Sequence, residues 1–198
     1  MGKYGGNSQT SLPSVPVPAP KPAAQPSASY DVAVTFTLKN EGLYSNDSAD
    51  SGGPTMMGIT QSDLSNFLGR PATVDEVKNM TLDTAKAIYR ANYWVEALGQ
   101  LSQPKATAIF DWGVLHGPVS GRQAAQRVAN ALGCSLSVDG QLGALSVAGL
   151  NKLADHAFCQ AYAAEIKATF DAIIAHNPTQ QVFRNGWYAR AERIAALA

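Results

Sequence analysis

The chain has 198 residues, a length that fits one domain or one domain with a tail. Its 15 Lys and Arg residues balance its 15 Asp and Glu residues, so the formal net charge is zero. This balance excludes nucleic acid as the main partner, because neutralising phosphates requires a basic surface. No apolar stretch approaches the roughly 20 residues that span a bilayer, so no membrane span is expected.

Residues 1–30 are predicted to form a flexible linker in front of the folded domain. They hold six of the eleven prolines, and Pro, Ser, Gly and Gln interrupt every apolar run. A secretory signal needs an uninterrupted apolar stretch, so the segment does not match one. Its composition buries too little apolar surface to offset the entropy lost on ordering. The folded domain is expected to cover residues 31–198.

From residue 31 onward the hydrophobic periodicity is mostly helical. Residues 31–40 combine features of a strand and a helix, and the helical pattern that follows favours a helix. Residues 44–59 are dense in Ser, Asn, Asp, Gly and Pro, which predicts a turn-rich loop or a small hairpin. Capping-box spacing at residues 60–63 and 73–76 predicts the starts of two short helices.

Longer helices are predicted in the rest of the chain, at residues 81–94, 104–116, 120–133, 150–176 and 186–197. Ser120 is expected to cap the third of these, and Gly133 to end it. On the first, one face carries Leu82, Ala85, Ile88, Tyr89 and Tyr93. The predicted fold class is therefore mainly α, with a small irregular hairpin or loop inserted after the first helix.

Acidic residues gather where the first predicted helix ends. Glu41 stands directly before the turn-rich loop, Asp47 and Asp50 lie within that loop, and Thr55 follows a Gly-Gly-Pro turn. Glycosidic bond cleavage needs an acid that protonates the leaving oxygen and a second carboxylate that steers water or stabilises the transition state. For Asp47 and Asp50 the alternative is turn capping, because Asp readily bonds its own backbone in loops.

Residues 41–55 (EGLYSNDSADSGGPT) and 58–60 (GIT) resemble the opening of the glycoside hydrolase family 108 muramidases, approximately E-G-G-Y, N-D, D-x-G-G-x-T and G-I-T. Further matches follow in order at residues 87–94 (AIYRANYW), 108–113 (AIFDWG), 116–118 (HGP) and 186–190 (GWYAR). The second half, with Asp139-Gly140 and Gly143, is similar to the predicted peptidoglycan-binding region that accompanies this family.

The resemblance implies a lysozyme-like helical domain that cleaves the β-1,4 bond between N-acetylmuramic acid and N-acetylglucosamine. It implies a glycosidase half at residues 31–116 and a peptidoglycan-binding-like half at 117–198. The essential glutamate of the family falls on Glu41, the expected general acid. Asp50 and Thr55 follow in an order also seen in bacteriophage lysozymes, which assigns Asp50 as base or electrostatic partner and Thr55 as a hydrogen-bond partner of the water. Leu43 replaces the usual second glycine, a departure close to the site.

Substrate binding is assigned to a set of polar and aromatic residues around this segment. They are Tyr44, Asp47, Tyr93, Trp94 and His116. Aromatic side chains stack on sugar faces, although aromatics at helical spacing more often lie in a core. His116 has the alternative of satisfying a helix C-terminus. Asp111, on an otherwise apolar helix, is predicted to be buried and structural.

No cofactor and no metal are predicted, because the three histidines have no metal-ligand spacing with Cys134 or Cys159. The two cysteines are expected to be free thiols, with a bridge as the alternative in an oxidising compartment.

The expected partner is the peptidoglycan glycan strand. Without a classical signal peptide, the enzyme is expected to be made in the cytoplasm and to reach the periplasm or cell wall by holin release, export or injection. It would then be a phage endolysin or a secreted antibacterial effector, with a cognate immunity protein and a secretion apparatus, reached through the linker, as further partners. The rival functions are a lytic transglycosylase, a non-catalytic peptidoglycan-binding module and a docking protein.

Overall fold

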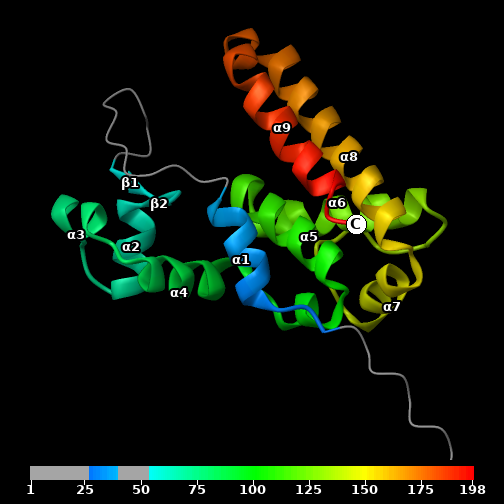
Figure 1. Ribbon diagram of the computed structural model, residues 1–198, viewed down its shortest axis with the longest axis horizontal. Coiled ribbons are helices and arrows are strands. Elements are labelled where there is room, and N and C mark those ends of the chain that lie inside the picture. Colours follow the sequence, from blue (N-terminus) through cyan, green and yellow to red (C-terminus); the bar gives the residue numbers. More distant parts are fainter. Residues whose placement is uncertain (1–26, 40–53) are drawn as a thin grey trace, which may run out of the picture.

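The computed structural model describes residues 27–39 and 54–198 (Figure 1). Nine α-helices lie in these residues, with one two-stranded antiparallel hairpin between the first and second. The helices are α1 (Tyr30–Leu38), α2 (Gln61–Leu68), α3 (Val74–Lys78), α4 (Leu82–Tyr93), α5 (Gln103–His116), α6 (Pro118–Ala131), α7 (Ala144–Lys152), α8 (Asp155–His176) and α9 (Arg184–Ala195). The hairpin is β1 (Thr55–Met56) and β2 (Ile59–Thr60), and short 3-10 helices are η1 (Glu96–Gln100) and η2 (Pro178–Phe183). The predicted mainly α fold with a small hairpin after its first helix is confirmed.

Helices α2, α3 and α4 each begin directly after a threonine whose side chain caps the helix. The hydroxyl oxygen of Thr60 accepts the backbone N–H of Asp63 at 3.1 Å, and that of Thr73 accepts the N–H of Glu76 at 3.1 Å. In both cases the acidic side chain accepts the backbone N–H of the threonine, which completes the predicted capping boxes. Thr81 caps α4 in the same way through its side chain.

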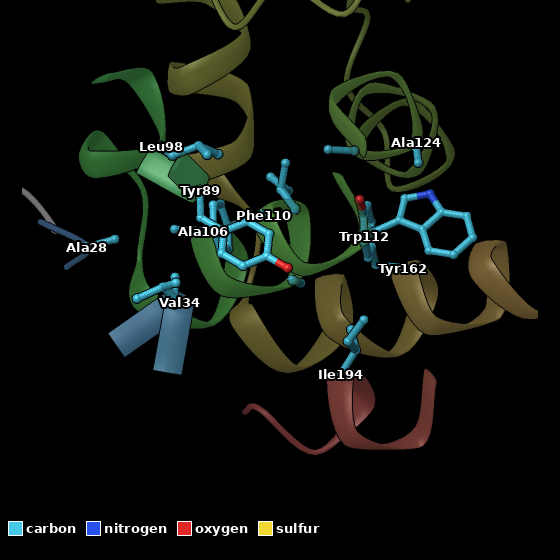
Figure 2. Packing of buried hydrophobic residues seen from close by; sticks show 14 of the residues in the cluster. Ala28, Val34, Tyr89, Leu98, Ala106, Phe110, Trp112, Ala124, Tyr162 and Ile194 are labelled. Carbon is cyan, nitrogen blue, oxygen red and sulfur yellow. The ribbon is translucent and has the colours of Figure 1, made fainter. Parts of the chain in front are cut away.

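Helix α5 lies at the centre of the molecule. It packs against α1, α6 and α8, and nearly all of it is buried from Lys105 to Gly113. Figure 2 shows Phe110 and Trp112 of α5 among core residues from other elements. Those labelled are Ala28, Val34, Tyr89, Leu98, Ala124, Tyr162 and Ile194, and Ala106 of α5 is labelled as well. A helix buried all round, rather than along one stripe, is the core element around which the others are arranged.

The start predicted for the helix after α5 is wrong. Ser120 does not cap it, because α6 already begins at Pro118, with Gly117 as its N-cap at φ +96°. Proline suits the first helical position, since it lacks an N–H that would otherwise need a partner. The predicted end is confirmed: Gly133 follows the helix at φ +97°, the left-handed conformation that closes helices.

The single helix predicted over residues 150–176 is also wrong, because two helices meet there. Leu153 and Ala154 are extended and separate α7 from α8. Lys105, only 2% exposed, donates from Nζ to the backbone oxygen of Leu153 at 2.8 Å and pairs with Asp155. A buried ammonium group needs such partners, so it holds the chain at this break.

The apolar face of α4 is not buried along its whole length. Leu82 is 50% exposed, whereas Ala85, Ile88 and Tyr89 are buried as expected. Leu82 is the first residue of α4, where the helix has not yet reached the core.

Helices α5 and α6 cross at two glycines without side chains between them. A Cβ atom on Gly121 would lie 2.8 Å from the backbone oxygen of Ile109 and 3.0 Å from backbone atoms of Gly113. The hydroxyl of Tyr162 donates to the backbone oxygen of Gly121 at 2.8 Å, which ties α8 to the same crossing. Only glycine permits this approach, because the atoms it meets are backbone atoms that cannot rotate away.

We expect Gly121→Ala to lower the free energy of unfolding by about 1–3 kcal/mol, the usual cost of overpacking a core. Gly186→Ala is the matched control, since a Cβ there meets nothing within 4 Å on α9. In that variant the free energy of unfolding should instead rise by about 0.5–1 kcal/mol, because alanine has a higher helix propensity than glycine. Urea denaturation followed by circular dichroism measures both values, and equal effects at the two glycines would contradict the close crossing.

The two cysteines are free thiols in different surroundings. Cys159 is fully buried on α8, and burial raises the pKa of its thiol to about 11. Cys134 is half-buried, with its sulfur 3.7 Å from the backbone oxygen of Gly149. Because the thiolate is the reactive form, a thiol reagent at pH 8 should label Cys134 in the folded chain and Cys159 only after unfolding. Labelling both at the same rate without denaturant would contradict this burial.

Candidate active site

Four of the eight predicted site residues lie outside the described residues: Glu41, Tyr44, Asp47 and Asp50. The structure places the other four, Thr55, Tyr93, Trp94 and His116. It also describes the two elements that flank residues 40–53. Helix α1 ends at Leu38, three positions before Glu41, and β1 begins at Thr55.

The hairpin that carries Thr55 is fixed to α4. Thr55 pairs with Thr60 across the two strands, and the turn between them has positive φ at Met57 (51°) and Gly58 (75°). Two consecutive positive φ values are typical of the tight turn that matches strand twist. The hydroxyl of Tyr89, on α4, donates to the backbone oxygen of Met57 at 2.7 Å. The half-buried Thr55 is thereby held beside a core helix.

Helix α1 is anchored at its N-terminal end. The backbone N–H of Ala28 donates to the oxygen of Gly99 at 3.0 Å, and that of Ser29 to Oε1 of Gln103 at 2.7 Å. Gln103 is the first residue of α5, and α1 and α5 lie side by side (Figure 1). Their C-terminal ends therefore point to the same side of the molecule, with Leu38 as the last residue of α1 and His116 as the last residue of α5.

Trp94 lies toward the other end of α1. Its ring packs edge-on against Tyr30, the first residue of α1, at 5.5 Å between centroids, and against Phe110 at 5.9 Å. It also lines a hollow of about 320 Å³ with Arg90 and Glu96. A nine-residue helix is about 13.5 Å long, so Trp94 lies at the opposite end of α1 from Leu38, its last residue. Sugar stacking by Trp94 stays a prediction, and its ring has a packing role.

Tyr93 and His116 lie closer to the elements that flank the site. Tyr93 packs 5.7 Å from the ring of Tyr89, the residue that holds the hairpin. His116 is exposed at the end of α5 and stacks on Trp112 at 4.7 Å, with an angle of 18° between the ring planes. Its exposed ring on the side where α1 ends is compatible with substrate contact, which stays a prediction.

A buried ion pair joins the last helix to α5. Arg190 of α9 donates from Nε to Oδ2 of Asp111 at 2.8 Å, and from one terminal nitrogen to Oδ1 at 2.9 Å. The two side chains are 8% and 0% exposed. Asp111 thus has the buried position predicted for it. Asp111 directly precedes Trp112 in the sequence, so the ion pair positions the part of α5 that leads to His116.

Comparison with known proteins shows which family the elements around the candidate site resemble. The sequence pattern of the family described as glycosyl hydrolase 108 matches residues 34–117, from within α1 to the end of α5. The chain therefore contains a glycosyl hydrolase 108 domain. This domain includes the positions of all eight predicted site residues.

A solved structure similar to this chain extends the likeness beyond the glycosyl hydrolase 108 domain. The structure of Brucella abortus SagA is 28% identical in sequence, with a TM-score of 0.70, and the match covers 84% of this chain and 91% of that one. No curated protein matches the chain. The predicted lysozyme-like helical fold is confirmed, and the domain is a glycoside hydrolase. The family match ends at residue 117, so peptidoglycan binding by the second half stays a prediction.

Two further observations concern the described part of the chain. Residues 27–39 and 54–198 contain no group of three or more His, Cys, Asp or Glu side chains placed to hold a metal ion. None of the helices described there is long and apolar enough to cross a membrane.

Proposed function

We propose that the chain is a peptidoglycan hydrolase, an N-acetylmuramidase that cleaves the β-1,4 bond between N-acetylmuramic acid and N-acetylglucosamine. The observation that carries this proposal is the glycosyl hydrolase 108 match over residues 34–117. It spans Glu41, Asp50 and Thr55 together with the C-terminal part of α1 and the hairpin, the elements that flank residues 40–53.

In this mechanism Glu41 is the general acid that protonates the leaving glycosidic oxygen. Asp50 is the base or electrostatic partner that steers the attacking water or stabilises the oxocarbenium-like transition state. Thr55 hydrogen-bonds the water. Tyr89 supports this arrangement because it holds the hairpin at Met57, two residues after Thr55. An acid that works at neutral pH needs a raised pKa, which apolar neighbours such as Leu38 and Leu43 would supply to Glu41.

The substrate is the glycan strand of peptidoglycan, bound by Tyr44, Asp47, Tyr93, Trp94 and His116. The enzyme acts in the cell wall, as a phage endolysin or as an antibacterial effector delivered by a secretion system. In the second case a cognate immunity protein covers the cleft, and residues 1–30 connect the domain to the delivery apparatus.

The product of the reaction tests the proposal. Purified peptidoglycan is digested with the wild-type chain and with Glu41→Gln, and the released fragments are identified by mass spectrometry. Fragments with a reducing-end muramic acid, absent from the variant digest, are the expected result. Anhydro-muramic acid products would instead make the chain a lytic transglycosylase. Sedimentation with cell walls without any released fragment would make it a binding module.

A further inference from the structure

A small hollow opens where the two halves of the chain meet, between η1 of the first half and, in the second half, α6 and the loop that precedes α7. It has a volume of about 250 Å³, and its walls combine apolar side chains with one charged group. The lining residues are Val95, Ala97, Arg122, Gln141, Leu142 and Gly143. None of them belongs to the site proposed for bond cleavage, although Gly143 lies in the region that resembles a peptidoglycan-binding sequence.

Arg122 is the charged group of this hollow. Its Nε donates to the backbone oxygen of Gly140 at 2.6 Å, which fixes the guanidinium plane against the loop. The two terminal nitrogens carry four further N–H donors, and within residues 27–39 and 54–198 they have neither a hydrogen bond nor an ion pair. The side chain is half-buried, and this burial lowers the pKa of the guanidinium. A partly desolvated cation with unused donors favours an anion beside it.

The loop wall that holds Arg122 is rigid. The fully buried side chain of Gln126 accepts the N–H of Gly140 at 2.8 Å and donates to the backbone oxygen of Gln141 at 2.9 Å. Gly140 has φ +74°, and a Cβ there would lie 2.8 Å from Cγ1 of Val119. The guanidinium is therefore held in place before any ligand arrives, which lowers the entropy cost of binding.

Asp139 is the acidic residue of the loop at 132–143, and it does not pair with Arg122. Asp139 accepts hydrogen bonds at Oδ1 from Gln126 and from the backbone N–H of Gln141, each within 2.9 Å. Among the described residues it forms no ion pair with Arg122. In addition, Gly143 is the N-cap of α7 and provides no side-chain cap, so the positive end of that helix lies at the same hollow.

We propose that this hollow binds the terminal carboxylate of a short peptide, with Arg122 as its bidentate partner. Guanidinium and carboxylate match in geometry, and the apolar walls of Val95, Ala97 and Leu142 suit a small apolar side chain next to that carboxylate. Peptidoglycan carries short peptides of this kind, ending in alanine, on its glycan strands. The inference rests on the proposed function for its source of ligand and adds recognition of the peptide to cleavage of the glycan.

Binding is tested without catalysis, using the full chain. The probe is a synthetic stem tetrapeptide with a C-terminal alanine carboxylate, and the control probe is the same peptide as its C-terminal amide. Calorimetry should show that Arg122→Leu binds the acid peptide at least tenfold more weakly than the wild type does. The wild type should bind the amide peptide just as weakly, because the amide has no carboxylate. Arg193→Leu is the matched control, since Arg193 is exposed on α9 and outside the hollow. Equal affinity of both peptides, no binding to the wild type or equal loss in both variants would overturn the proposal.

A second readout separates recognition from a structural role of Arg122. Turnover is measured on glycan strands with their peptides and on strands from which an amidase has removed them. Arg122→Leu should lower turnover only on the peptide-bearing strands, and Ala97→Phe, which fills the hollow but keeps the arginine, should do the same. An equal fall on both substrates would mean a structural role and overturn the proposal. If the wild type cleaved neither substrate, the proposed function would fail, while the calorimetric result would still decide peptide binding.

Discussion

Glu41→Gln is expected to lower the rate of glycan cleavage by about a hundredfold to ten-thousandfold, the contribution of a general acid to such reactions. Glutamine has the same shape as glutamate but has no acidic proton to give to the leaving oxygen. The loss should therefore occur in turnover rather than in binding to the cell wall. Release of soluble fragments from purified peptidoglycan measures the first quantity, and co-sedimentation measures the second.

Glu192→Gln is the matched control for this prediction, because that side chain is 64% exposed on α9. It should leave turnover unchanged. Asp50→Asn distinguishes the two candidate reactions. A hydrolase that uses a second carboxylate loses activity in this variant, whereas a lytic transglycosylase retains it. If Glu41→Gln were as active as the wild type, Glu41 would not be the acid and the proposed mechanism would be wrong.

Breaking the buried pair of Asp111 and Arg190 is expected to have the largest effect on stability. Arg190→Met leaves the carboxylate of Asp111, which is fully buried, without its bidentate partner. Removing one member of a buried pair typically costs about 3–5 kcal/mol, because the remaining charge stays desolvated. Guanidinium chloride denaturation of the wild type and the variant measures this difference.

A double replacement separates the cost of a lone charge from the value of the pair. In Asp111→Leu with Arg190→Met no charge remains, so this protein should be more stable than Arg190→Met alone. Arg184→Met is the control, since Arg184 on the same helix is 40% exposed and its distance to Asp171 is 3.7 Å. It should change the free energy of unfolding by less than about 1 kcal/mol. A loss in Arg190→Met no larger than in the control would mean that the pair does not hold α9 to α5.

Local signals in the sequence predict most of the helices. The side chains of Thr60 and Thr73 form the capping boxes that their spacing indicates, and Gly133 ends α6 as its position suggests. These features act within three or four residues, so they are visible in the sequence. The pattern of residues 31–40 is ambiguous by itself, and the structure shows a helix at Tyr30–Leu38 because its small residues pack against α5.

Features that depend on distant residues could not be predicted. The break between α7 and α8 is held by Lys105, 48 positions before Leu153, and the apolar pattern continues across it. Arg190 meets Asp111 across 79 positions, so the sequence marks Asp111 as unusual without naming its partner. No sequence motif marks Arg122 as a binding residue. Only the fold of the following loop places it in a hollow with unused N–H donors.

The candidate site itself was proposed from motifs rather than from periodicity. Glu41, Asp50 and Thr55 are named through their resemblance to a family, and periodicity contributes only the helix before them and the turn-rich segment between them. What the structure adds is the support of Thr55 by the hairpin, through a hydroxyl of Tyr89 whose burial on α4 was expected but whose hydrogen bond to Met57 was not.

The aromatic packing described above gives the chain three built-in optical reporters. Its three tryptophans belong to different regions: Trp94 beside the start of α1, Trp112 in the centre of α5, and Trp187 stacked on Phe170 between α8 and α9. Trp94 therefore senses the start of α1, whereas Trp112 and Trp187 both contact Phe170 and sense the packing of α8 against α5 and α9. Single-tryptophan versions would show by their fluorescence whether the first and second halves melt together or in sequence, with no added dye.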